Sequence, residues 1–392
     1  MSASARAVVL IAAVKFVFIL DFMMLMPLGP DVATALGFSA ERLGWLSASY
    51  TLASMLAGLL AIRWLDRFSR RPAFLLCFGT LVVATAATTQ AWNLPSLLLL
   101  RGLTGLAGAP AVALGMAIVI DAVPPQARGR AIGRVMIGFS LAAVAGIPLA
   151  LELARLGSWV TPFWLVAGLG ALVWLAAWRL LPSSTPVADT GSPAVSPFSL
   201  LSQAVVRKAC LIQAGNQFAA FLVVPHFSAF FLLNLGFPRE YLGLLYLVGG
   251  IAAFVTMQVL GQLTDRHGAA WSAGVATLAT VIGLTPFLNL DWPWLVLPFV
   301  LFMAGNAGRN VSIAALTTQV PTPAERAGYL ALEGIVQDLA VTLAAVAASV
   351  ILMTGAGGEL LGAHWVAALA MTLVSLTWLA VLRWQPQLAR GH

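Results

Sequence analysis

Long apolar segments, separated by short polar joins, follow one another along almost the whole chain. Twelve of them approach the roughly 20 residues that a helix needs to cross a bilayer. Prolines and glycines mark many of the joins, where a helix ends readily. The expected spans cover residues 7–30, 43–64, 72–91, 94–120, 131–154, 159–181, 208–234, 240–262, 270–289, 292–318, 327–353 and 361–383. The pattern predicts an all-α integral membrane protein with twelve transmembrane helices.

The composition supports this class of protein. Hydrophobic residues make up 60% of the 392 residues and charged residues only 9%, whereas soluble domains carry about 25% charged residues. The chain therefore has too few charged side chains to cover a water-facing surface, and its outer face must contact lipid. The formal net charge of +7 is divided among the loops, which does not indicate nucleic acid binding.

Motifs that would indicate an enzyme or a metal protein are missing from the sequence. The two lysines, Lys15 and Lys208, do not lie in a phosphate-binding loop of the Walker type. Cys77 and Cys210 lie in or beside apolar segments and indicate no disulfide. Neither a His-Glu-x-x-His nor a Cys-x-x-Cys motif occurs. We therefore expect no enzyme activity, no metal and no cofactor.

Basic residues are distributed unevenly over the predicted loops. If both termini face the cytoplasm, fifteen basic residues lie on that side and three, Arg42, Arg155 and Arg239, on the other. This asymmetry follows the positive-inside rule and indicates a multi-pass protein of an inner, cytoplasmic membrane. The segment 7–30 is interrupted by charges and lacks a clear cleavage site, so we interpret it as the first span and not as a signal peptide.

Two polar features repeat at half the chain length. Asp66 and Asp265 lie in related loops 199 positions apart, and Arg128 and Arg326 follow later spans at an offset of 198. Two features at nearly one offset indicate an internal duplication, and hence two six-helix bundles related by pseudo-two-fold symmetry. A Ser- and Pro-rich stretch between the halves is typical of a flexible cytoplasmic linker. The expected parts are a first bundle at 1–181, a linker at 182–207 and a second bundle at 208–392.

Several motifs carry a family resemblance that covers essentially the whole chain. The pattern Gly-x-Leu-x-Asp-Arg-x-Gly-Arg-(Arg/Lys) is kept in part by the two related loops, at Asp66, Arg67, Arg70 and Arg71 and at Gly261, Leu263, Asp265, Arg266 and Gly268. Later spans contain Arg101 with Gly105, Gly138, and Gly146-Ile147-Pro148. In these motifs the chain resembles the major facilitator superfamily. The last is similar to the glycine-proline motif of the drug:proton antiporter and sugar-efflux branch, with Ile147 inserted between the two residues.

The resemblance implies that the charged loops gate a conformational change. Asp66 can accept hydrogen bonds at a helix N-terminus, where the helix dipole favours a carboxylate, and Arg70 or Arg71 could reach Asp121. A solvated loop that merely orients the protein is the alternative, and a purely structural kink is the alternative for the glycine-proline motif. The expected gating residues are Asp66, Arg67, Arg70, Arg71, Asp121, Gly146, Pro148, Asp265 and Arg266.

Ionisable residues inside the first-half spans point to a binding or coupling site. Each costs about 2.5–3.5 kcal/mol at a helix centre, so it needs a partner or a water-filled cavity. Asp21 and Arg101 lie at similar depths and are expected to pair. The resemblance places their spans beside a central cavity. A static structural pair is the alternative.

The second-half spans carry a larger polar set. Arg309 and Glu333 lie at matching depth and are expected to pair. Asp338 lies nearer the midplane, where a desolvated carboxyl suits proton carriage; the alternative is a neutral acid bonded to Asn306. His226 is either a packing histidine or a proton relay. The candidates of this half are Asn216, Gln217, His226, Asn306, Arg309, Asn310, Glu333, Gln337 and Asp338.

Together these features predict a secondary active transporter that exports small molecules by proton-coupled alternating access. Drug-like compounds, sugars and other metabolites are the expected substrates, and protons and the lipid bilayer the other partners of a monomer. A facilitator or importer of a sugar or other metabolite is the alternative within transport. A non-transporting membrane receptor or assembly factor is the alternative of another class, and the buried ionisable residues argue against it.

Overall fold

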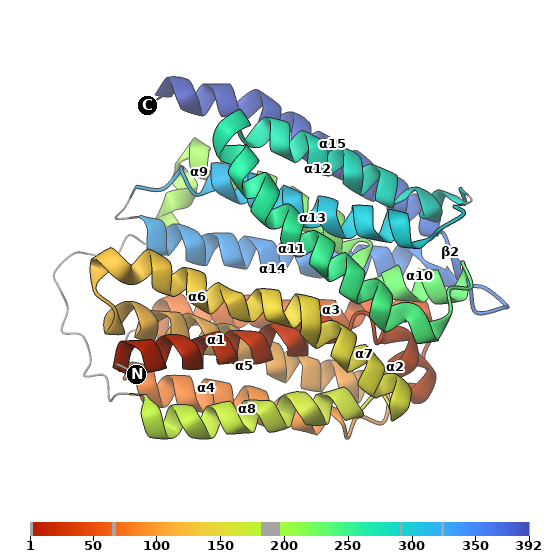
Figure 1. Ribbon diagram of the computed structural model, residues 1–392, viewed down its shortest axis with the longest axis horizontal. Helices are drawn as coiled ribbons and strands as arrows, with labels where there is room; N and C mark the ends of the chain where they lie inside the picture. Colours follow the sequence, from red (N-terminus) through yellow and green to blue (C-terminus); the bar gives the residue numbers. More distant parts are fainter. Residues whose placement is uncertain (1–2, 65–67, 182–196, 291, 323–324, 392) are drawn as a thin grey trace. The chain divides into compact units, whose positions relative to one another are not determined.

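The computed structural model describes residues 3–64, 68–181, 197–290, 292–322 and 325–391. Its chain divides into two compact units, and both consist almost entirely of helices (Figure 1). The first unit comprises Met1–Phe38 and Leu46–Pro193, and the second comprises Ser39–Trp45 and Ala194–His392. The division after Pro193 lies inside the expected linker 182–207.

The first unit surrounds its N-terminal helix. α1 packs against α5, α6 and α8, while α4 packs against α5 and α8. A π-helical turn, Ala142–Gly146, joins α6 to α7 without interrupting the helical path. The helices are α1 (Ala3–Met24), α2 (Gly29–Leu36), α3 (Leu43–Trp64), α4 (Arg70–Thr88), α5 (Leu94–Ala122), α6 (Arg128–Leu141), α7 (Ile147–Leu156) and α8 (Thr161–Leu180), with the 3-10 turn η3 (Pro125–Ala127). The 3-10 turn η1 (Ala40–Arg42) and the first residues of α3 belong to the second unit.

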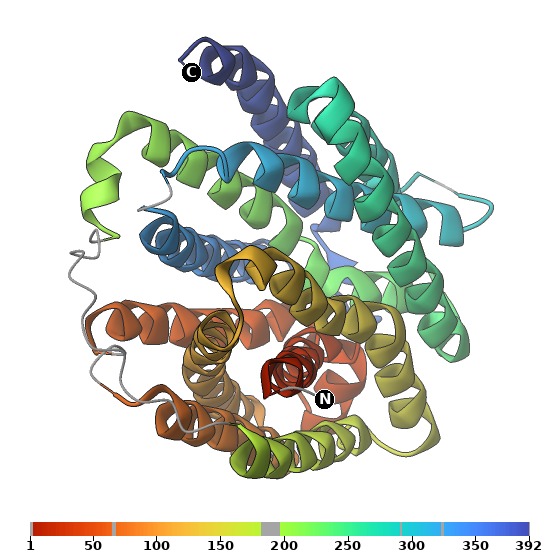
Figure 2. The same cartoon turned by 60° about the vertical axis from the view of Figure 1, so that its left-hand side comes forward.

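The second unit packs around α13, which contacts α11 and α12 along much of its length. α14 packs against α9, and α15 packs against both α9 and α12 (Figure 2). The helices are α9 (Ala204–Phe221), α10 (Phe227–Leu233), α11 (Leu242–His267), α12 (Ala269–Gly283), α13 (Val296–Thr317), α14 (Arg326–Ile351) and α15 (Ala363–Gly391). The 3-10 turns are η5 (Ser199–Ser202), η6 (Val224–His226), η7 (Arg239–Tyr241) and η8 (Thr285–Leu288).

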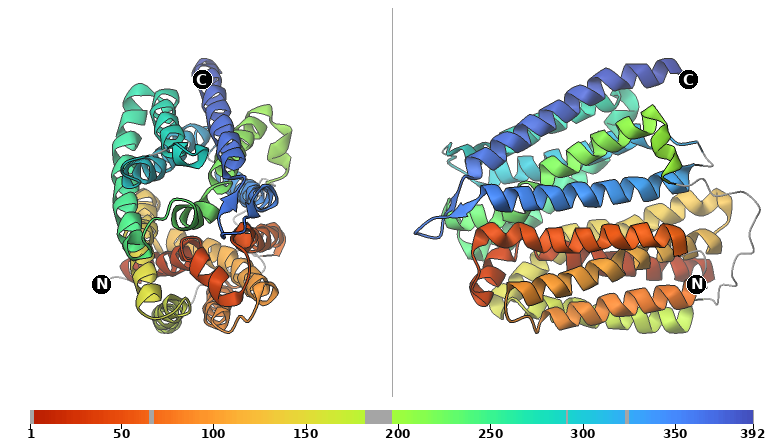
Figure 3. Two further views of the ribbon diagram at one scale, coloured as in Figure 1. Left: turned by 90° about the vertical axis from the view of Figure 1, so that its right-hand side faces the viewer. Right: turned by 180° about the vertical axis from the view of Figure 1, so that it is seen from behind.

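A two-stranded hairpin joins α14 to α15 in this otherwise helical unit. β1 (Met353–Thr354) pairs antiparallel with β2 (Leu360–Leu361). The Asn234 amide fixes the hairpin to the end of α10, because Nδ2 donates to Leu360 O at 3.0 Å and Oδ1 accepts from Leu360 N at 2.9 Å. Figure 3 shows the hairpin at one end of the unit.

Eleven helical segments within the described residues are long and apolar enough to cross a membrane. They confirm an all-α multi-pass membrane protein. The segment expected as the span 270–289 is different, because α12 has only 15 residues and is followed by η8, which contains Pro286. The expected first span 7–30 is divided between α1 and α2, and the expected span 208–234 is divided at Pro225 into α9 and α10.

The boundaries of the helices follow local chemistry. Asn93 and Ser96 form a capping box before α5, in which Asn93 Oδ1 accepts from Ser96 N at 2.9 Å and Ser96 Oγ accepts from Asn93 N at 3.2 Å. Helical structure begins at Ser199, so the last residues of the expected linker already belong to η5 and α9. Glu325 precedes α14 and accepts hydrogen bonds from Gln203 and Thr322, which lower the pKa of its carboxyl.

Candidate functional site

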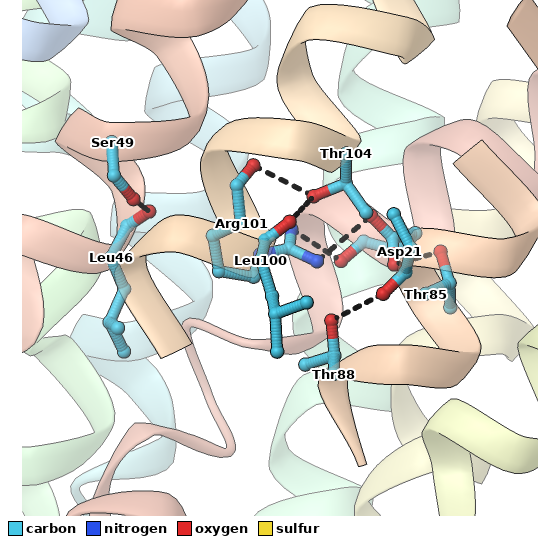
Figure 4. Close-up of polar contacts among 9 residues, drawn as sticks. Asp21, Leu46, Ser49, Thr85, Thr88, Leu100, Arg101 and Thr104 are labelled. Atoms are coloured by element: carbon cyan, nitrogen blue, oxygen red, sulfur yellow. Dashed lines mark hydrogen bonds and ion pairs between the residues drawn. The ribbon is translucent and has the colours of Figure 1, made fainter. Parts of the chain in front are cut away.

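Asp21 of α1 and Arg101 of α5 form an ion pair inside the first unit (Figure 4). Arg101 Nη1 donates to Asp21 Oδ2 at 3.0 Å, and Arg101 Nη2 donates to the backbone oxygen of Asp21 at 3.1 Å. The side chains are 0% and 1% exposed. The pair expected from their matching depths is therefore present, and it is fully removed from solvent.

Two further side chains hold this pair in place. Thr85 of α4 donates through Oγ1 to Asp21 Oδ1 at 2.9 Å, so both carboxylate oxygens accept a hydrogen bond. The Arg101 guanidinium lies 4.8 Å from the ring centroid of Tyr50, a cation–π contact with α3. One turn further along α5, a Cβ at Gly105 would collide with the backbone oxygen of Tyr50, so only glycine permits this close approach. Four helices thus converge on one buried charge pair.

A second polar cluster, formed by Gln213, Thr317 and Glu333, lies in the second unit. Gln213 Nε2 donates to Glu333 Oε1 at 2.8 Å, and Thr317 Oγ1 donates to the same oxygen at 3.3 Å. Glu333 is 7% exposed. The cluster joins α9, α13 and α14 through one buried carboxyl group.

Arg309 of α13 does not pair with Glu333, and this expectation was wrong. Arg309 is 1% exposed, and its Nη1 and Nη2 have no hydrogen-bond partner among the described residues. The expectation assumed that α13 and α14 end at one level. Instead Glu333 contacts Thr317, which lies eight residues and therefore about 12 Å along α13 from Arg309.

Asparagines on α9 and α13 connect the same two helices nearer to Arg309. Asn216 Nδ2 donates to Asn310 Oδ1 at 2.6 Å, and the Asn216 side chain is fully buried while its own Oδ1 has no partner in the described chain. Asn310 follows Arg309 directly on α13. This part of the second unit therefore combines unsatisfied donors with an unsatisfied acceptor, an arrangement that suits a polar ligand.

His226 occupies the break between α9 and α10 and is 2% exposed. Its Nε2 lies 3.1 Å from the backbone oxygen of Glu41, which belongs to the short segment assigned to the same unit. Because that oxygen can only accept, Nε2 must carry the proton. The contact agrees with the packing alternative, and the relay role stays a prediction.

The other second-half candidates lie on the expected helices. Asn306 is on α13, and Gln337 and Asp338 are on α14, all three of them half-buried. Asp338 lies five residues beyond Glu333, which corresponds to about 7.5 Å along the helix. Gln217 is also half-buried and lies on α9. Their roles in binding or coupling stay predictions.

The gating candidates are described in part. Arg70 forms an ion pair with Asp121 between the ends of α4 and α5, as expected, and Arg71 donates to the backbone oxygen of Trp178 in α8. Asp66 and Arg67 lie outside the described residues. In the related loop, Asp265 and Arg266 are exposed at the end of α11.

The glycine-proline motif coincides with the π-helical turn. The backbone N–H of Ile147 donates to Ala142 O, five residues earlier, and Pro148 stands in the first turn of α7. Gly146 packs against Leu20 of α1, one residue before Asp21. π-Helical turns occur frequently at functional sites, and this one adjoins the buried pair.

The chain is similar to known proteins in three comparisons. The profile described as Major Facilitator Superfamily matches residues 11–212, just over half of the chain. A protein named probable sugar efflux transporter from Helicobacter pylori is 24% identical over 272 residues, which are 67% of this chain and 67% of that protein. A chloramphenicol resistance protein from Streptomyces lividans is 26% identical over 280 residues, 70% of this chain and 68% of that protein.

Among solved structures, a mutant of the nucleoside transporter NupG superimposes with a TM-score of 0.75. It covers 97% of this chain and 99% of its own, at 14% sequence identity. At that identity the likeness shows the fold.

Proposed function

Because the chain belongs to the major facilitator superfamily, we propose that it exports small molecules from the cell in exchange for protons. The protein is a multi-pass membrane transporter and not an enzyme. What the proposal adds is the direction of transport, the coupling ion and the substrate class.

The observation that carries the proposal is the burial of acids inside membrane helices of both units. Asp21 is 0% exposed beside Arg101, and Glu333 is 7% exposed with no basic partner among the described residues. Asp338 is half-buried, five residues further along α14. A buried carboxyl that is not compensated by a cation favours its protonated form, and it can release the proton when water or a cation approaches. Acids of this kind inside a membrane protein are typical of proton pathways.

The names of two relatives support the direction and the substrate class. One is named for sugar efflux and the other for chloramphenicol resistance. We therefore propose efflux of drug-like compounds or sugars, with alternating access of the site to the two sides of the membrane.

The proposed topology has twelve spans, with both termini in the cytoplasm and the protein as a monomer in the inner membrane. α12 and η8 together cover Ala269–Leu288, and we propose this segment as the span that completes the twelve. An even number of spans keeps both termini on one side, which the fifteen-to-three distribution of basic residues favours.

Transport into inverted membrane vesicles tests the function. With an acidic lumen, so that the proton gradient is directed outward, we expect accumulation of chloramphenicol or of a labelled sugar in exchange for protons, and collapse of that accumulation by an uncoupler. Vesicles carrying Glu152→Gln are the matched control, since Glu152 pairs with Arg155 at an exposed position, 42% accessible. Accumulation that ignores the uncoupler would instead identify a facilitator or another coupling ion.

The Arg70–Asp121 ion pair provides a separate prediction about gating. The two side chains are 31% and 34% exposed, so the pair contributes at most about 1 kcal/mol to stability. We expect Asp121→Asn to lower the transport rate severalfold while leaving substrate affinity and thermal stability nearly unchanged, because the pair joins helix ends far from the buried acids. Initial rates and equilibrium binding, measured on the same vesicles, separate the two effects.

The charge-reversed double variant Arg70→Asp with Asp121→Arg provides the control for this prediction. It restores the attraction with the charges exchanged, and should recover part of the rate. If Asp121→Asn transports at the normal rate at matched expression, the pair only orients the protein and has no part in gating.

A further inference from the structure

A long groove lies between α12 and α15 on the second unit, the two helices that run side by side in Figure 1. Its volume is about 860 Å³. One wall follows α12 from its first turn to Val281, and the other consists of residues of α15 between Ser375 and Gln385. Most of the lining side chains are apolar or aromatic, so the groove suits a hydrocarbon chain.

Specific contacts build the wall of the groove near the start of α12. Trp378 Nε1 donates to Ala270 O at 3.0 Å, and Gln385 Oε1 accepts from Ala270 N at 2.6 Å. At Gly274, a Cβ would lie 2.8 Å from Trp378 Nε1, so the missing side chain leaves room for the indole. The two helices are therefore held at a fixed separation, and the groove between them is a built feature of the fold.

The length of the groove matches one leaflet of a bilayer. The lining residues of α12 run from Ala270 to Val281, a rise of about 16 Å, while half of the hydrocarbon core is about 15 Å thick. Leu278, which is 62% exposed, and Val275, which is 45% exposed, face outward from the second unit along this length. A single acyl chain could therefore lie along α12 over most of its depth.

One end of the groove is basic. Arg266 and His267 end α11 directly before α12, and Arg383 lies on α15 beside the lining residue Leu382; all three are exposed. Asp265 is the acidic residue at this end, which leaves an excess of positive charge. Trp271 lines the groove next to His267, with ring centroids 5.1 Å apart, and tryptophan is the residue preferred at a membrane interface.

We propose that this groove binds one anionic phospholipid, with an acyl chain along α12 and the headgroup phosphate at Arg266, His267 and Arg383. Apolar walls supply affinity for any lipid tail, while the basic end supplies the preference for a negatively charged headgroup. The site is separate from the buried acids of the proposed transport pathway, and it is independent of which substrate is carried.

Native mass spectrometry of the full chain with added lipid tests the proposal. The purified protein is titrated with dioleoyl phosphatidylglycerol and, separately, with dioleoyl phosphatidylcholine. We expect at least fivefold tighter binding of the first phosphatidylglycerol molecule. The variant His267→Gln with Arg383→Gln should reduce this preference to less than twofold, whereas Arg179→Gln, an exposed arginine near the end of α8, should leave it unchanged.

Filling the groove separates the tail site from the headgroup site. Ser375→Phe and Val275→Phe should each weaken binding of both lipids, because both residues line the groove. Leu376→Phe is the matched control, since Leu376 is 55% exposed on the same helix but does not line the groove. Each variant is first checked for a single monodisperse species, so that misfolding does not imitate lost binding.

Four results would overturn the proposal. Equal affinity for the two lipids would rule out recognition of an anionic headgroup. A preference that survives in the variant His267→Gln with Arg383→Gln would rule out headgroup binding at these residues. Unchanged lipid binding in both groove-filling variants would rule out binding of an acyl chain in the groove. A dimer that Ser375→Phe dissociates would show that a second copy of the chain, and not a lipid, covers the groove.

Discussion

Replacing Asp21 by asparagine is expected to abolish transport and to destabilise the first unit. The change leaves the Arg101 guanidinium buried at 1% exposure without a counter-charge. Removing one partner of a buried ion pair costs about 3–5 kcal/mol, which corresponds to roughly a hundredfold or more in a folding or binding equilibrium. Arg101→Leu should be similarly damaging, because it leaves the carboxylate with Thr85 alone. Thermal unfolding in detergent and vesicle transport measure the two effects.

The double variant Asp21→Asn with Arg101→Leu distinguishes a pair from two independent residues. If the side chains stabilise each other, the double variant should unfold at a higher temperature than either single variant. Additive losses would show that each residue acts alone. Recovery of stability without recovery of transport would assign the pair a role in function as well as in folding, and so would separate coupling from the static alternative.

Replacing Asp338 by asparagine is expected to abolish proton-driven accumulation while passive exchange continues. A gradient of one pH unit supplies about 1.4 kcal/mol per proton, enough for a roughly tenfold accumulation ratio. Without the titrating carboxyl, this ratio should fall to one. Accumulation and exchange are measured in the same vesicles, so that loss of coupling is distinguished from loss of binding.

Glu333→Gln should have a smaller effect than Asp338→Asn. Glu333 Oε1 accepts from Gln213 and Thr317, and the amide oxygen of glutamine can accept the same two bonds. Asp338 lies further along α14 and nearer its middle. Glu240→Gln, at an exposed position beside the start of α11, is the matched control. Unaltered accumulation in Asp338→Asn would contradict the assignment, and a full loss in Glu333→Gln would move the proton site to that residue.

The sequence predicted the membrane spans and the first-half pair well, for physical reasons. A bilayer requires long apolar helices, so the spans are visible in composition alone. Asp21 and Arg101 are so costly inside lipid that a common depth predicts their contact. Neither Thr85 nor Thr317 could be selected in this way, because threonine is common in membrane helices and its hydroxyl often bonds within its own helix. Their contacts to the acids depend on how neighbouring helices pack.

Counting residues from the expected helix ends gave a wrong pair where the ends of neighbouring helices are staggered. It placed Arg309 opposite Glu333, yet Glu333 contacts the end of α13 at Thr317. The interrupted helices were also missed, because the residues around Met24 and Pro225 remain apolar through each break. Hydropathy predicts which segments lie in the membrane, but it does not predict where a helix breaks within a segment.

The π-helical turn at Ala142–Gly146 changes which side chains share one face along the fifth membrane segment. Its wide turn, with Ile147 N–H bonded to Ala142 O, accommodates one extra residue. A helical wheel drawn straight from Arg128 to Leu156 is therefore displaced by about 100° after the turn, and would assign side chains of α7 to the wrong neighbours. Deleting one residue here would restore an ordinary helix and leave Leu151, now fully buried, on its present face, whereas closing the turn without a deletion would rotate Leu151 by about 100°. Because of the extra residue, the helical periodicity of α7 does not continue that of α6. The inward-facing residues of the two helices therefore follow two separate patterns in the sequence.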